Sequence, residues 1–131
     1  MRLKASEVRK LLGERAPSKY RARPHVVDGI RFASSLEARR YQELGQLQKA
    51  GVVLWFIRQP SFDLGAGVRY VADFLVVYAG MLQRISVEDC KGFKTPVFKV
   101  KEKLFRERYP AVQLRLVTAA DLGRGRHDRS A

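Results

Sequence analysis

The chain has 131 residues, a length suited to one domain, and 46% of them are hydrophobic, too many for a disordered protein. Its 26 Lys and Arg against 13 Asp and Glu give a net charge of +13, which points to a polyanion. Nucleic acid is the first candidate and an anionic membrane surface the competing one. No long apolar run is present and the sequence start lacks a signal core, so a membrane span is excluded. The single cysteine, Cys90, excludes an internal disulfide and a structural zinc cluster. We therefore expect a soluble protein of a reducing compartment.

Two basic segments flank the expected core. Residues 1–25 carry many more Lys and Arg than acids and are broken by prolines. They are either a solvated arm or an arm that grips phosphates, and the two roles are compatible. Residues 119–131 form a basic tail, in which His127 is expected to be a tail residue and not a ligand or base.

A helix is predicted from Ser34 to Ala50. Ser34 and Glu37 have the spacing of a capping box, which favours a capping role for Glu37. The helical wheel instead places Glu37 on the same inward stripe as Leu44. From the spacing and the wheel alone, both roles remain open.

Strands are predicted next. The unbroken apolar run 52–57 is typical of a strand buried on both faces. Gln59 follows it and is expected to be an edge residue, with a place beside a functional site as the alternative. Residues 64–67 are predicted to be a loop, and residues 68–91 a hairpin that turns tightly at 79–80.

A second helix is predicted from Thr95, as N-cap, to about Arg108. Its expected inward stripe is Val97, Val100 and Leu104, with Phe98 and Phe105 beside it. Lys99 and Lys103 fall on the outer face, which we expect to be solvated unless it borders the site. The alternating segment 112–117 predicts a last strand, and a helical crossover would lay it parallel to its neighbour in a mixed sheet.

Two acids and a lysine interrupt the hairpin strands. Asp89 and Lys91 are two residues apart and share one strand face, while Asp73 precedes the apolar part of the neighbouring strand. Carboxylates at such a short distance repel each other unless a divalent cation neutralises their charge, and Mg²⁺ prefers oxygen ligands. Lysine beside them would orient water or stabilise phosphoryl charge. The alternative is a set of structural ion pairs, which give little net stability.

Asp73, the triplet Asp89-Cys90-Lys91 and the helical Glu37 together resemble the signature of the restriction-endonuclease-like, PD-(D/E)XK, nuclease superfamily. The predicted order αβββαβ is also that of its core, an α/β fold with a mixed sheet flanked by helices. Segments 58–60, 70–74 and 87–92 are similar to a small phage- and prophage-borne family that resembles archaeal-type Holliday junction resolvases. The resemblance covers about residues 29–118 of what we expect to be a single nuclease domain, 1–131.

The resemblance implies a role for each site residue. Asp73 and Asp89 would bind Mg²⁺ or Mn²⁺ through their carboxylates, with the Cys90 main-chain carbonyl as an extra ligand. Glu37 would complete the metal site, beyond any capping role. Lys91 would position or activate the attacking water.

Two departures from the archaeal pattern stand out. Ala38 occupies the place of the arginine that usually follows the helical glutamate, so Arg39 or Arg40 would substitute for it. Asp89 replaces the commoner glutamate, which would bring the metal closer to the strand. The residues expected to contact nucleic acid are Arg39, Arg40, Gln59, Lys94, Lys99 and Lys103.

The implied function is metal-dependent hydrolysis of DNA phosphodiesters at four-way (Holliday) junctions in the host cytoplasm. Two scissile strands call for two active sites, hence a C2 homodimer, with Phe32, Phe62 or Met81 near its interface. One alternative is another nuclease of the superfamily that cuts flaps, nicks or duplex DNA. The other is a non-catalytic basic nucleic-acid-binding module whose acids are structural.

Overall fold

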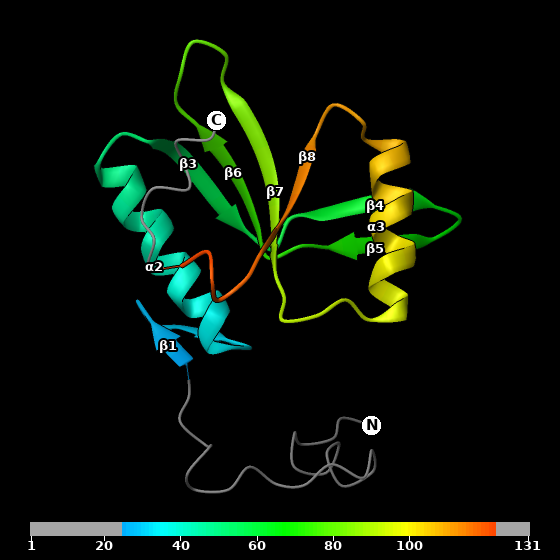
Figure 1. Ribbon diagram of the computed structural model, residues 1–131, viewed down its shortest axis with the longest axis horizontal. Coiled ribbons are helices and arrows are strands. Elements are labelled where there is room, and N and C mark those ends of the chain that lie inside the picture. The colour runs from blue at the N-terminus through cyan, green and yellow to red at the C-terminus, as the bar shows by residue number, and fades with distance from the viewer. Residues whose placement is uncertain (1–24, 123–131) are drawn as a thin grey trace, which may run out of the picture.

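A computed structural model describes residues 25–122 (Figure 1). The predictions made for the basic arm up to residue 24 and for the tail from residue 123, including His127, lie outside the described residues. No helix between residues 25 and 122 has the length and apolar character needed to cross a membrane.

Four strands form the central sheet, in the order β3-β6-β7-β8. Strands β3 (Val53–Arg58), β6 (Phe74–Tyr78) and β7 (Arg84–Cys90) pair antiparallel in turn. Strand β8 (Gln113–Val117) lies parallel to β7, because a helix intervenes between them and carries the chain back to the same end. The predicted mixed α/β sheet is confirmed.

Helices α2 (Ser35–Lys49) and α3 (Pro96–Arg108) lie on opposite sides of this sheet (Figure 1). Both predicted N-caps are present: the Ser34 hydroxyl accepts a hydrogen bond from the Glu37 N–H at 3.1 Å, and Thr95 does the same for the third helical residue of α3. Because the helices cover opposite faces of the sheet, strand residues pack into two separate hydrophobic cores. The core under α2 contains Phe32, Ala38, Leu44, Val53, Phe74, Val76 and Tyr78. The core under α3 contains Leu64, Tyr70, Ala72, Val87, Phe98, Phe105 and Leu114.

Two small hairpins complete the described chain. Strands β1 (His25–Val27) and β2 (Ile30–Phe32) pair beside α2, and β4 (Ser61–Gly65) and β5 (Val68–Val71) pair beside α3. Positive φ angles at Ala66 and Gly67 make the tight turn of the second hairpin. The second half of the predicted loop 64–67 is this turn and its first half belongs to β4, while the predicted hairpin 68–91 is divided between two sheets.

The structure corrects the prediction for the first central strand. Strand β3 is an edge strand and lies farthest from the β7–β8 half of the sheet that α3 covers. Trp55 and Ile57 are consequently each 48% exposed, whereas the sequence run predicted burial on both faces. The turn after β6 is also longer than predicted, because Tyr78 pairs with Arg84 and leaves residues 79–83 as a loop.

The predicted inward stripe of the second helix is out of phase. Val97 and Val100 are 66% and 59% exposed, while Phe98, Glu102 and Phe105 are the buried residues of α3. An inward glutamate is tolerated because two cations pair with it, which an apolar pattern cannot reveal. Among the expected interface residues, Phe32 is buried and Phe62 packs against Phe105, so of these only Met81 is fully exposed.

Candidate active site

Three predicted acids from three different elements lie together at one end of the sheet. Asp73 stands directly before β6, and its N–H donates to the main-chain oxygen of Glu88 in β7 at 3.1 Å. This pairing places Asp73 beside Asp89. The Asp73 carboxyl group interacts electrostatically with that of Asp89 and with that of Glu37 from the first turn of α2.

The Asp73 carboxyl group is the centre of this chain of acids. Burial is the largest cause that raises its pKa, to about 7, and the neighbouring Asp89 and Glu37 carboxylates raise it further. The Cys90 N–H opposes this shift, because it donates to Asp73 Oδ2 at 2.7 Å. Near neutral pH the Asp73 carboxyl group is therefore partly protonated, and a bound cation would displace that proton.

Glu37 serves both of the roles that its sequence position suggested. Its main-chain N–H is capped by Ser34, and its side chain is buried and turned toward Asp73. Burial is the largest cause that raises the pKa of the Glu37 carboxyl group, while the positive charge of Arg58 acts in the opposite direction. The inward orientation predicted from the helical wheel is confirmed.

Lys91 and Tyr70 engage the two oxygens of Asp89. Lys91 Nζ lies 3.5 Å from Asp89 Oδ1 and 4.6 Å from the centroid of the Phe98 ring. A cation–π contact with α3 therefore helps to hold the lysine in place. The Tyr70 hydroxyl donates to Asp89 Oδ2 at 2.5 Å, and burial raises the pKa of Tyr70, which keeps it a donor. The sequence did not predict a role for Tyr70, because only the β4–β5 hairpin brings it under β7.

The metal prediction has a limited geometric basis. Within residues 25–122, no three His, Cys, Asp or Glu side chains are arranged so that they could hold a metal ion. The three-carboxylate set that was expected is thus not preformed, and Asp73 is the acid whose pKa both of the other carboxylates raise. Carboxylate oxygens still fit a hard cation such as Mg²⁺ or Mn²⁺. Burial raises the pKa of the Cys90 thiol, so this residue offers its carbonyl oxygen and not a thiolate.

A cleft of about 430 Å³ opens beside the acids. Glu37 and Asp73 line it together with Arg31, Phe32, Ala33, Gln59, Val71 and Ala72. Gln59 has a φ of 52° and donates its N–H to the main-chain oxygen of Asp73 at 2.9 Å, so it borders the site and is more than an edge residue. A larger depression of about 640 Å³ runs along α2, but none of the three acids lines it.

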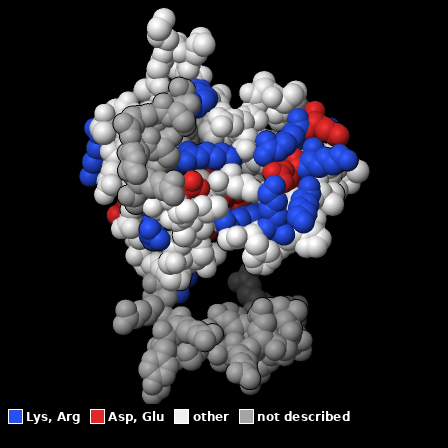
Figure 2. All heavy atoms as spheres, in the orientation of Figure 1, with Lys and Arg blue, Asp and Glu red and all other residues white. Residues whose placement is uncertain are grey.

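Most of the residues expected to contact nucleic acid lie on the surface. Figure 2 shows Lys and Arg side chains gathered over α3 around a small acidic spot. Lys99 and Lys103 are exposed there, and Lys94 Nζ pairs with Glu102 at 2.9 Å. Arg39 is exposed on α2. Their position leaves them accessible to a phosphate backbone.

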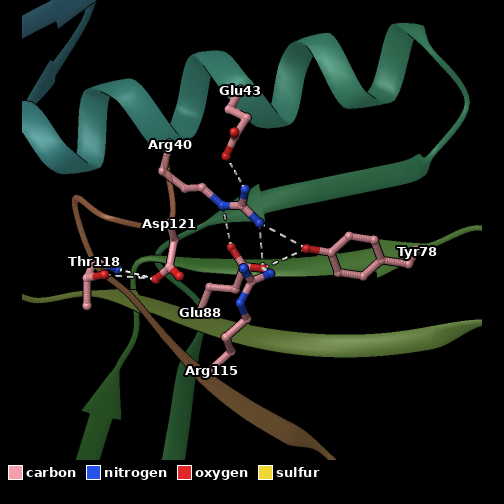
Figure 3. A network of polar contacts seen from close by, with 7 residues as sticks. All are labelled: Arg40, Glu43, Tyr78, Glu88, Arg115, Thr118 and Asp121. Atoms are coloured by element: carbon pink, nitrogen blue, oxygen red, sulfur yellow. Dashed lines mark hydrogen bonds and ion pairs between the residues drawn. The ribbon is translucent and has the colours of Figure 1, made fainter. Parts of the chain in front are cut away.

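Arg40 is the exception, and its predicted contact with nucleic acid is wrong. The side chain is fully buried between α2 and the sheet (Figure 3). Its Nε and Nη2 donate to the two carboxylate oxygens of Glu88 at 2.7 and 2.8 Å, and Nη2 also reaches the Tyr78 hydroxyl at 2.9 Å. Arg40 is three residues from Glu37 and so faces the sheet. The sequence signal that was missed is Glu88, a second acid in an apolar strand on the face opposite Asp89.

Comparisons with curated proteins and with solved structures gave no match. A family model described as "Protein of unknown function (DUF1064)" matches residues 17–122, a range that includes the three acids and Lys91. The chain therefore belongs to the DUF1064 family.

Proposed function

We propose that this protein is a metal-dependent DNA endonuclease with a restriction-endonuclease-like core. The observation that supports the proposal is the convergence of Glu37, Asp73 and Asp89 at one end of the sheet, where they influence one another electrostatically, with Lys91 Nζ 3.5 Å from Asp89. Neighbouring, partly buried carboxylates are unfavourable without a neutralising charge. A site for a cation gives this arrangement a function.

Asp73 and Asp89 would hold Mg²⁺ or Mn²⁺, with the Cys90 carbonyl as an extra ligand and Glu37 completing the site. The ion, when bound, supplies a water of lowered pKa and neutralises charge on the phosphate. Lys91 orients the attacking water and stabilises the developing negative charge. Tyr70 fixes one oxygen of Asp89, and the Cys90 N–H fixes one oxygen of Asp73.

The proposed substrate is branched DNA, with the four-way junction as the first candidate. The net charge of +13 and the exposed basic surface of α3 suit a phosphate backbone. Arg39, Lys94, Lys99 and Lys103 would hold phosphates without reading bases. The choice of a junction and of a C2 homodimer rests on the resemblance to the resolvases and on the need to cut two strands.

A paired cleavage assay tests this proposal. Purified protein with Mg²⁺ is incubated with a four-way junction and with linear duplexes of the same sequence. Symmetric paired nicks near the crossover, with intact duplex, support a resolvase, and cleavage of the duplex indicates another nuclease activity. Binding without cleavage in either Mg²⁺ or Mn²⁺ refutes the endonuclease and leaves a basic binding module.

Two variants test the site assignment. Asp73→Ala and Asp89→Ala are expected to bind the junction as the wild type does and to lose cleavage. A wild-type cleavage rate in Asp73→Ala would refute the assignment of the metal site. Lys49→Ala is the matched control, because it removes an exposed charge from the last turn of α2 without touching the acids.

A further inference from the structure

Figure 3 shows the ion pair between Arg40 of α2 and Glu88 of β7, the residue that precedes Asp89 in the chain. Both side chains are fully buried, and the guanidinium meets the carboxylate through two hydrogen bonds, at 2.7 and 2.8 Å. The Tyr78 hydroxyl donates to Glu88 Oε2 at 2.7 Å, and Arg115 Nη1 lies 3.7 Å from the same oxygen. Arg40 also pairs with Glu43 of its own helix. The buried charges are therefore compensated from the helix and from three strands.

The expected gain in stability does not explain this pair. A buried ion pair is often no more stabilising than apolar side chains of similar size, because both charges lose their hydration. What a two-bond guanidinium–carboxylate contact does provide is a fixed distance and direction. Its contribution is therefore to geometry.

Helix α2 needs such a fixed contact. Its buried residues are Glu37, Ala38, Arg40 and Leu44, so only two of the four are apolar. Tyr41 and Leu47 add partly buried apolar contacts, and non-directional packing of this kind tolerates small rotations and shifts of the helix. The ion pair at Arg40 removes that freedom within one turn of Glu37.

Glu88 connects this contact to the other two acids. Its main-chain oxygen accepts the Asp73 N–H at 3.1 Å, and Asp89 follows it in the chain. Its carboxylate holds Arg40, one turn along α2 from Glu37. The positions of Glu37, Asp73 and Asp89 are thus all set through Glu88.

We infer that Arg40 and Glu88 are positioning residues whose ion pair fixes α2 against β7, so that the Glu37 carboxylate reaches Asp73. The inference deepens the proposed function and, for its metal-binding readout, rests on it. Neither residue touches the substrate.

The test is the double variant Arg40→Met/Glu88→Met, which replaces the pair by apolar side chains of similar length. A single replacement would leave an uncompensated charge and is not informative about position. The double variant is expected to fold with a melting temperature near that of the wild type. Its affinity for Mn²⁺, measured from the electron paramagnetic resonance signal of free Mn²⁺, is expected to fall at least tenfold. Amide hydrogens of α2 are expected to exchange at least tenfold faster, with β6 and β7 unchanged.

Leu44→Ala is the matched control, because it weakens the packing of the same helix but leaves the ion pair in place. It is expected to lower the melting temperature and to keep the Mn²⁺ affinity within twofold of the wild type at a temperature where it is folded. Arg40→Lys keeps the charge and loses the two-bond contact, so it should weaken Mn²⁺ binding with a smaller loss of stability. This variant serves as the test if the double variant does not fold.

Wild-type Mn²⁺ affinity together with wild-type exchange of α2 in the double variant would overturn the inference. A wild-type protein that binds no Mn²⁺ and cuts no DNA refutes the proposed function instead. In that case hydrogen exchange decides the positioning role alone: unchanged protection of α2 overturns it, and faster exchange confined to α2 supports it.

Discussion

Each helix turns one ion-paired residue toward the sheet, Arg40 in α2 and Glu102 in α3, and the two residues have different surroundings. Arg40 of α2 meets Glu88, whose side chain is 0% exposed, whereas Glu102 of α3 meets Lys94 and Arg106, whose side chains are 41% and 51% exposed. Water screens the second cluster and not the first. A carboxylate–cation pair therefore fixes the position of α2 on one side of the sheet, whereas the pairs of Glu102 on the other side are part of the basic surface of α3.

Breaking the buried pair on one side should give the largest effect on stability. Arg40→Met leaves the Glu88 carboxylate in the core without its main partner, which costs about 3–5 kcal/mol of unfolding free energy. Urea titration monitored by circular dichroism measures this value. A loss as small as that of a surface pair would show that the two clusters are equivalent.

The acids near Arg40 should make the stability of the metal-free protein depend on pH. The pKa of Asp73 is about 7 in the folded protein and near the usual value of 3.8 in the unfolded chain. Between these values the folded state binds more protons, so this group destabilises the fold progressively as pH rises and fully above pH 7. After a discount for partial exposure, we expect a loss of about 1–2 kcal/mol between pH 4 and 8.

Urea titrations in EDTA across that range measure the dependence. Asp73→Asn should remove most of it, and Mn²⁺ should reverse it at pH 8, because the ion favours the ionised carboxylates. An unchanged pH dependence in Asp73→Asn would assign the titration to other groups.

The exposed lysines Lys99 and Lys103 of α3 should matter for DNA binding more than for folding. Lys99→Ala/Lys103→Ala is expected to lower the slope of log affinity against log salt concentration by about 2, since each phosphate contact contributes about 0.9. Fluorescence anisotropy with labelled junction DNA between 50 and 200 mM salt measures the slope. Lys49→Ala, at the other end of α2, is the control, and an equal change in that variant would mean that α3 is not the DNA surface.

The smallest effect is expected at Glu102. Glu102→Gln breaks two screened ion pairs and should cost at most about 1 kcal/mol, because water hydrates the released Lys94 and Arg106. Thermal melts at low and high salt measure this change. A cost comparable to that of Arg40→Met would remove the distinction between the two helices.

Local patterns in the sequence predicted much of the fold and part of the candidate site. The caps at Ser34 and Thr95, the mixed sheet and the shared face of Asp89 and Lys91 depend on spacing within one element, and all are present. The inward face of Glu37 followed from the helical period alone.

The predictions that failed depend on tertiary structure. Arg39 and Arg40 are the same residue type. The helical period turns Arg40 toward the sheet, but only the placement of α2 over β7 gives it the buried partner Glu88. The exposure of β3 follows from its place at the sheet edge, which its own residues do not determine. Tyr70 and Glu88 acquire their roles from partners 19 and 48 positions away in the sequence.

Trp55, half-exposed on edge strand β3, is the only tryptophan of the chain. Selective excitation of tryptophan, which avoids the five tyrosines, therefore reports on one site that lies apart from the acids and is open to collisional quenchers. Its emission spectrum and its quenching by acrylamide report on this strand alone. Self-association through β3 would shift the emission to shorter wavelength as protein concentration rises, and binding of an ion at the acids would leave it unchanged.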